Sequence, residues 1–176
     1  MSDVHAVLRF LRERGVDAIS HPGGTLLAHL DRTHTRLQSW GADASLSLAG
    51  LCHAAYGTDG FPHLLLPLER RSELAILVGA ASEAIVYSYC ACDRRYGLPG
   101  VLGREDMRDR FTGVCWKPDA RLRGQLAELT VANELDLYLH GELTSTNRRE
   151  IVAYMRACLP LVSAAAAIAV EALPFG

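Results

Sequence analysis

Leucine and alanine recur at helical spacing along most of the chain, and no stretch sustains the apolar–polar alternation of a strand. Near the start, for example, Val4, Leu8 and Leu11 fall on one face of a helix. β-branched residues are sparse, which also disfavours strands. The pattern therefore predicts an all-α fold.

Seven helical segments are predicted from this spacing and from glycine, proline and capping residues at their ends. They cover residues 3–14, 25–40, 44–55, 67–77, 80–95, 120–139 and 148–173, the last with a kink at Pro160. Asp43 is expected to cap the third helix. Residues 96–118 contain glycines, prolines and mixed charges, which predicts a loop with a short helix around 105–110.

Composition limits the class of protein. A chain of 176 residues suits one domain, so residues 1–176 are expected to form a single compact bundle of about seven helices. The 49% hydrophobic content excludes disorder, and a net charge of −2 argues against a surface for nucleic acid. The five cysteines include no CxxC pair and are expected to be small core residues.

Neither end of the sequence predicts a targeting or membrane segment. The apolar stretch at the start is broken by charged residues, unlike a signal peptide. Residues 151–173 are long enough to span a bilayer, but Arg156, Pro160 and Glu171 interrupt them, so a core helix is expected. These observations predict a cytoplasmic protein with no membrane partner. A homodimer that packs through the alanine-rich last helix remains an alternative to a monomer.

Histidines are concentrated in the first part of the chain, and two of them are predicted to face the core. His29 and His53 fall on the apolar faces of consecutive helices, where they can converge on one point. A buried imidazole needs a partner for each nitrogen, and a metal ion is a common one. His21 precedes the second helix and is a third candidate ligand, whereas His34 is predicted to face solvent or an interface. A purely structural histidine cluster remains an alternative.

Further polar residues are candidates for a site next to these histidines. Tyr56 lies in the loop after the third helix and is a candidate for substrate positioning or acid–base chemistry, although such a loop is also an ordinary connector. Glu83 shares a helical face with Asp93 and is a second candidate catalytic group. The candidates for substrate contact are Thr33, Thr58, Phe61, His63 and Asn133.

The segment TLLAHLDRTHTRLQSWGADASLSLAGLCHAAYGTD resembles the core helical pair of the HD (His-Asp) superfamily. Its order of a histidine, a threonine four residues on and a later GL-x-H is locally similar to myo-inositol oxygenase, at His29, Thr33, Gly50, Leu51 and His53. Most of the chain also resembles a family of small bacterial proteins of unknown function. That resemblance rests on HPGGTLLAHL, AGLCHAAYGT, VGAASEAIVYSYCACDR and ANELD.

The HD resemblance implies a helical fold around a buried metal site, with His29 and His53 as two of the ligands. An aspartate on a later helix completes such sites, and the resemblance suggests Asp93 for this position. An ion pair of Asp93 with an arginine is the alternative. The aspartate of the His-Asp pair is replaced by Ala54, which counts against a dinuclear phosphohydrolase site. A set of His21, His29 and His53, with or without Asp93, remains available for one ion.

These expectations together predict a metal-dependent enzyme that acts on a small-molecule substrate. One transition metal ion is expected, with Fe(II) favoured over zinc, because two histidines and a carboxylate with open positions suit Fe(II) and O₂. An oxidative reaction at a non-haem iron centre is therefore the first expectation. A metal-dependent phosphohydrolase, and a metal-free binding or accessory protein that uses the same cavity, are the alternatives.

Overall fold

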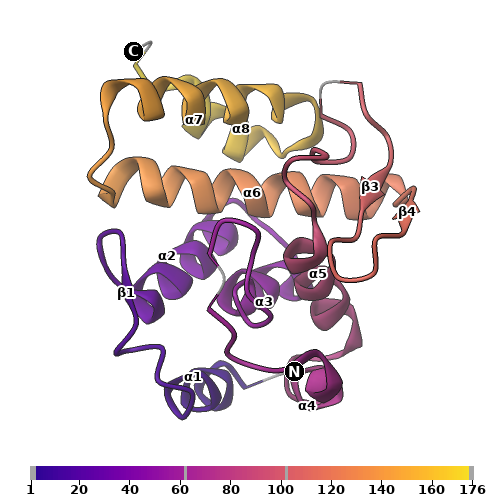
Figure 1. Ribbon diagram of the computed structural model, residues 1–176. Coiled ribbons are helices and arrows are strands. Elements are labelled where there is room, and N and C mark those ends of the chain that lie inside the picture. Colours follow the sequence, from indigo (N-terminus) through magenta and orange to yellow (C-terminus); the bar gives the residue numbers. More distant parts are fainter. Residues whose placement is uncertain (1–2, 62, 102, 175–176) are drawn as a thin grey trace.

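The computed structural model describes residues 3–61, 63–101 and 103–174. Within these residues eight α-helices form nearly all of the regular structure, which confirms the mostly helical fold (Figure 1). The helices are α1 (Val4–Arg12), α2 (Leu26–Ser39), α3 (Ala44–Cys52), α4 (Arg71–Val78), α5 (Ala80–Ala91), α6 (Ala120–His140), α7 (Ser145–Ala157) and α8 (Ala164–Glu171). Two 3₁₀ turns, η1 (Leu68–Arg70) and η2 (Leu159–Leu161), precede α4 and α8.

Helix α6 lies between two layers of helices (Figure 1). Helices α7 and α8 cover one side of it, and α2, α3 and α5 pack against the other. Because neighbours cover both sides, α6 buries polar residues as well as apolar ones. The buried polar residues are Glu128, Thr130, Asn133, Glu134 and Asp136. Buried polar groups require hydrogen-bond partners. The side chains that pair with these residues of α6 therefore mark the polar part of the protein interior.

Helices α2 and α3 pack closely against each other. Gly41, with a φ of 80°, follows the end of α2, and Asp43 begins α3 by accepting a hydrogen bond from the N–H of Leu46 at 2.8 Å, as predicted. Gly50 faces α2, and a Cβ atom at this position would lie only 2.5 Å from Cδ1 of Leu37. The missing side chain thus allows the two helices to approach.

The prediction of a short helix around residues 105–110 is wrong, because this region forms a hairpin. Strand β3 (Met107–Arg108) pairs with β4 (Cys115–Trp116) in antiparallel fashion. In the turn between them, Oδ1 of Asp109 accepts hydrogen bonds from the N–H groups of Phe111 and Thr112. The carboxylate therefore satisfies amides that a helix would otherwise pair. A second hairpin, β1 (Ser20–His21) with β2 (Gly24–Thr25), leads into α2.

The expected last helix is divided into α7 and α8 at Pro160, which lies in η2. Ser163 starts α8 by accepting a hydrogen bond from the N–H of Ala166, and Glu128 of α6 holds Ser163 through both carboxylate oxygens. The chain reverses here, so α7 and α8 lie side by side over α6 (Figure 1). In the described residues, no helix has the length and apolar character that crossing a membrane requires.

Substitution of Gly50 by alanine tests the close approach of α2 and α3. The new methyl group collides with buried Leu37, and we expect the free energy of unfolding to fall by about 1–3 kcal/mol, despite the higher helix propensity of alanine. Urea unfolding measures the change. Ser45→Ala on the same helix is the control and should shift stability by less than about 0.5 kcal/mol. Equal stability of the Gly50 variant and the parent chain would contradict this packing.

Candidate functional site

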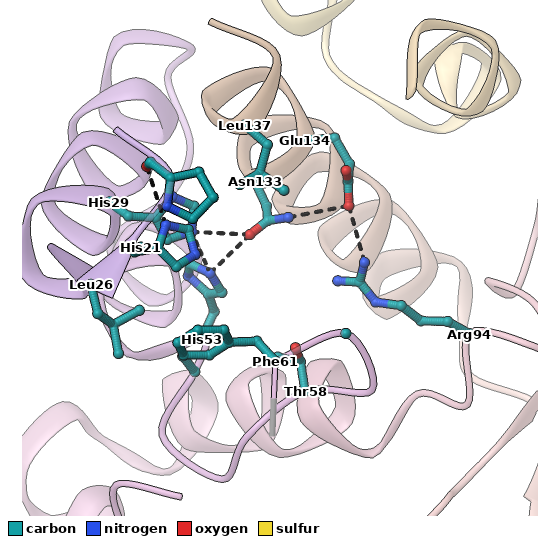
Figure 2. A pocket seen from close by; sticks show the side chains of 13 residues that line it. His21, Leu26, His29, His53, Thr58, Phe61, Arg94, Asn133, Glu134 and Leu137 are labelled. Atoms are coloured by element: carbon teal, nitrogen blue, oxygen red, sulfur yellow. Dashed lines mark hydrogen bonds and ion pairs between the residues drawn. The ribbon is translucent and has the colours of Figure 1, made fainter. Parts of the chain in front are cut away.

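A polar cavity of about 220 Å³ opens beside α2, the end of α3 and α6 (Figure 2). The β1–β2 hairpin and the loop after α3 form its rim. The cavity brings together six of the residues that the sequence singled out: His21, His29, His53, Thr58, Phe61 and Asn133. It therefore assembles side chains from segments that are more than a hundred residues apart.

His29 and His53 meet at the wall of this cavity, with their Nε2 atoms 3.2 Å apart. Both residues are buried, as predicted. Nδ1 of His29 lies 2.7 Å from Oδ2 of Asp136, and Nδ1 of His53 lies 2.7 Å from the carbonyl oxygen of Gly50. These oxygens can only accept, so each Nδ1 carries a hydrogen and donates it. Where neither Nε2 atom carries a proton, the two present lone pairs to each other, and a proton on either one makes the hydrogen bond between them.

Asn133 adds a third acceptor to this pair. Its Oδ1 atom lies 3.1 Å from Nε2 of His29 and 3.1 Å from Nε2 of His53. Its Nδ2 atom donates to Oε1 of Glu134 at 3.2 Å, which fixes the orientation of the amide. Three lone-pair atoms thus form a triangle, which we call the acceptor triangle (Figure 2). Such atoms repel one another unless a proton or a metal ion lies among them.

Asp136 orients the acceptor triangle by accepting the Nδ1 hydrogen of His29. Its carboxylate is fully buried and accepts two hydrogen bonds from Arg32, at 2.7 and 2.8 Å, besides the one from His29. Burial alone would raise the pKa of Asp136, but the hydrogen bonds from Arg32 and His29 outweigh it and hold this pKa well below its usual range. An ionised Asp136 keeps the hydrogen of His29 on Nδ1.

Asp136 and Arg32 were not among the site residues expected from the sequence. Asp136 follows Asn133 by three residues on α6, and Arg32 follows His29 by three residues on α2, so each pair shares a helical face. This spacing was the signal from which Asp136 and Arg32 could have been found. It does not show, however, that these faces of α2 and α6 meet.

His21 covers the acceptor triangle and does not join it. Its ring stacks on that of His29 with a centroid distance of 4.1 Å and meets the edge of Phe61 at 5.2 Å. Burial, followed by the nearby His29, lowers the pKa of His21 to about 4. Among the described residues, no three His, Cys, Asp or Glu side chains are arranged to hold a metal ion. The structure therefore does not assemble the expected set of His21, His29 and His53 with Asp93.

Asp93 lies on the turn after α5 and does not line the cavity. Its Oδ1 atom accepts hydrogen bonds from the backbone N–H groups of Arg95 and Tyr96. Its Oδ2 atom lies 3.9 Å from Nη1 of Arg108, which is the arginine pairing considered as the alternative. The carboxylate thus organises a turn.

Tyr56 and Glu83 are brought together, but away from the cavity. The hydroxyl of Tyr56 donates to Oε1 of Glu83 at 2.8 Å, and Arg71 pairs with both oxygens of Glu83. These contacts join the end of α3 to α4 and α5. The same burial that isolates Tyr56 from the cavity, together with its bond to Glu83, raises the pKa of this hydroxyl far above its usual range.

Thr33 and His63, the two other candidates for substrate contact, lie outside the cavity lining, and so does His34. Thr33 is buried and donates to the backbone oxygen of His29 at 2.9 Å. His63 is exposed and packs its ring against Phe61. The prediction that His34 faces solvent or an interface is wrong, because α3 packs over it and the carbonyl of Ser47 lies 2.7 Å from its Nδ1.

Arg94 and Glu134 form the wall opposite the histidines (Figure 2). Nη1 of Arg94 donates to Oε1 of Glu134, and Nη2 donates to the hydroxyl of Tyr89, both at 3.0 Å. The loop after α3 positions Arg94, since Asp59 accepts a hydrogen bond from its backbone N–H. The cavity thus has a guanidinium group facing its histidines.

The pH dependence of stability tests the buried, neutral state of His53. Burial, followed by the nearby His29, lowers the pKa of His53 to about 3, whereas the unfolded chain takes up this proton near pH 6.5. The stabilisation is complete above pH 6.5 and is lost as the pH falls towards 3. For metal-free protein in EDTA, we expect His53 to contribute about 2 kcal/mol to the fall in the free energy of unfolding between pH 7 and pH 5, beside the contribution of His21, whose pKa is also lowered.

Urea unfolding at several pH values measures this slope. His53→Gln should make the slope shallower and leave the part due to His21, while His5→Gln, at an exposed position on α1, should leave it unchanged. A slope as steep in the His53 variant as in the parent chain would show that this ring does not stay neutral in the folded protein.

Residues 10–94, just under half of the chain, match a family described as a domain of unknown function, DUF6817. The matched segment includes His21, His29, His53 and Arg94 but ends before the residues of α6. No curated protein and no solved structure matches the chain. These comparisons show no link to the HD superfamily or to myo-inositol oxygenase. What they show is a similarity to a domain whose function is not known.

Proposed function

We propose that the acceptor triangle is a mononuclear metal site and that the chain is a metal-dependent enzyme for a small metabolite. The carrying observation is the convergence of three lone-pair atoms, Nε2 of His29, Nε2 of His53 and Oδ1 of Asn133, at separations of 3.1–3.2 Å. Ligand atoms bound at about 2.0–2.1 Å are roughly 2.8–3.0 Å apart in octahedral geometry and roughly 3.3–3.4 Å apart in tetrahedral geometry, and the observed separations lie between these values. The spacing of this chain's own atoms therefore fits a zinc-sized ion.

The surroundings of the triangle support the same proposal. Asp136 accepts the Nδ1 hydrogen of His29, and Gly50 accepts that of His53, which is the arrangement that orients metal-binding imidazoles and increases their basicity. The order of His29 and His53 also matches the HD resemblance, with Asn133 in place of an expected carboxylate. With neutral ligands, a bound divalent ion keeps its full charge and supplies Lewis-acid chemistry.

The opposite wall supplies groups for a hydrolytic reaction. In the described residues, Oε2 of Glu134 has no hydrogen-bond partner, yet no side-chain N or O atom is both fully buried and unpaired, so this oxygen is open to solvent. It is positioned to accept a proton from a water in the cavity, and Arg94 beside it is positioned to bind an anionic group. The cavity of about 220 Å³ is smaller than the roughly 300–1,000 Å³ of drug-sized pockets, which favours a small substrate.

Oxidative chemistry at Fe(II) is the second candidate. Its specific support is that the three ligand atoms belong to one compact triangle, which leaves the remaining positions of a six-coordinate ion for substrate and O₂. The expectation of a carboxylate ligand favoured this reaction. The proposed set contains the amide of Asn133 instead, so we place hydrolysis first.

Metal binding tests the site directly. Tag-free protein should bind one zinc ion or, anaerobically, one Fe(II) ion per chain in calorimetry and metal analysis. His53→Ala and Asn133→Leu should each weaken binding by more than about 100-fold, because each removes a ligand atom. Asn133→Asp should tighten it, because a carboxylate adds negative charge at the same position. His5→Ala is the matched control and should bind like the parent chain.

Circular dichroism should show that the variants remain folded. Binding that survives in both His53→Ala and Asn133→Leu would reject this ligand set. If no metal binds and both nitrogens of His29 carry protons in ¹⁵N NMR spectra, a proton occupies the triangle, and the metal-free binding protein is the correct alternative.

The reaction class is tested on metal-loaded protein with p-nitrophenyl phosphate and p-nitrophenyl acetate as small esters. We expect release of nitrophenol by the zinc form and a loss of about 10²–10⁴ in kcat for Glu134→Gln, with zinc affinity unchanged. O₂ uptake by the Fe(II) form with small polyols, without ester cleavage by the zinc form, would reverse the order of the two candidates.

A further inference from the structure

A second cavity lies on the outer side of Asp136, away from the acceptor triangle. It is an open groove of about 500 Å³, and its lining includes Arg32 and Arg36 of α2 and Trp40, which follows that helix. Leu135 of α6 and Ala169 of α8 form its apolar part. The groove therefore combines two guanidinium groups, an indole and an apolar floor.

Beside this groove, the less exposed guanidinium groups outnumber the buried carboxylates. Asp136 pairs with Arg32 at 2.7 Å and lies 3.7 Å from Nη1 of Arg36, so one buried carboxylate faces two guanidinium groups. Asp31 also lines the groove, but its side chain is exposed to water, which screens its charge. In the partly desolvated part of the site, two guanidinium groups therefore share one carboxylate.

Arg36 is the more distant of the two from this carboxylate. Its side chain is only 15% exposed, and its Nη1 atom donates to the carbonyl oxygen of Ala132 at 3.0 Å. Within the described residues, its Nε and Nη2 atoms have no hydrogen-bond partner, and no fully buried side-chain nitrogen is unpaired, so these donors reach solvent in the groove. Burial also lowers the pKa of Arg36. An acceptor that carries negative charge would satisfy both the charge and the donors.

We propose that this groove binds a small organic anion. Its oxyanion group, a phosphate or a carboxylate, pairs with Arg36 and Arg32, and its apolar body lies against Trp40 and Leu135. The site is separate from the cavity at the acceptor triangle, where Arg94 is the guanidinium group.

Asp136 connects the groove to His29. Its Oδ2 atom accepts hydrogen bonds from both Arg32 and His29, so an anion that draws Arg32 towards the groove leaves more of the carboxylate's charge to His29. Occupation of the groove is therefore expected to strengthen the hydrogen bond from Nδ1 of His29. This link belongs to the metal-free chain and does not depend on the proposed metal.

The test uses the fluorescence of Trp40 in a Trp116→Phe background, where it is the single tryptophan. Metal-free protein in EDTA is titrated with phenyl phosphate, benzoate and neutral benzamide. We expect saturable fluorescence changes with the two anions and none with benzamide, and the tighter anion identifies the preferred head group. Binding should weaken as salt rises. A response to benzamide equal to that of both anions would overturn the proposal.

Variants separate the groove from other basic positions. Arg36→Met should weaken phenyl phosphate binding about tenfold, which corresponds to one lost charged hydrogen bond. Asp31→Asn should tighten it, because it removes an opposing charge. Arg12→Met, at an exposed position on α1, and Arg94→Met, in the other cavity, should leave it unchanged. Equal affinity in the Arg36 and Asp31 variants and the parent, or a loss of binding in Arg94→Met, would overturn the proposal.

The link through Asp136 has its own readout. Phenyl phosphate should shift the ¹H–¹⁵N signal of the His29 Nδ1–H group in the metal-free protein, and the shift should saturate at the same concentration as the Trp40 signal. A His29 signal that stays constant while Trp40 responds would reject the connection to the acceptor triangle.

Discussion

The buried carboxylate of Asp136 is the interaction on which both the packing and the site depend. It joins α6 to α2 by pairing with Arg32, and it also accepts the hydrogen of His29. Removal of one partner from a buried ionic cluster leaves an uncompensated charge, which costs about 3–5 kcal/mol. The cluster therefore fixes the position of α2 on α6, because a shift of either helix would separate these buried charges at a cost in free energy.

This fixed position determines the chemistry of the cavity. With its Nδ1 hydrogen held by Asp136, His29 turns its Nε2 atom towards His53 and Asn133. These two residues turn Nε2 and Oδ1 inward in the same way, because Gly50 and Glu134 hold their hydrogens. Three acceptors at contact distance favour a cation between them. The site that we propose thus follows from where hydrogens are held around the triangle as much as from the three residues themselves.

The helices could be predicted because apolar spacing is a local property of the chain. The errors at the β3–β4 hairpin and at the last helix have a common cause, since both depend on contacts with distant residues. Asp109 stabilises the β3–β4 turn while it also accepts a hydrogen bond from Tyr87 of α5, and Glu128 of α6 holds the start of α8 after Pro160. Local propensity carries no information about such partners.

The sequence by itself determined that His29 and His53 face the core, because the helical period fixes the face on which a residue lies. It also singled out Asn133 as a polar interruption of α6. Only the tertiary structure decided their partners. It places Asp136 where it accepts the Nδ1 hydrogen of His29, and it places Asp93 in a turn, where its carboxylate accepts a backbone hydrogen bond. The physical reason is that periodicity fixes the direction of a side chain along its own helix, whereas the packing of α2 against α6 decides which side chains meet.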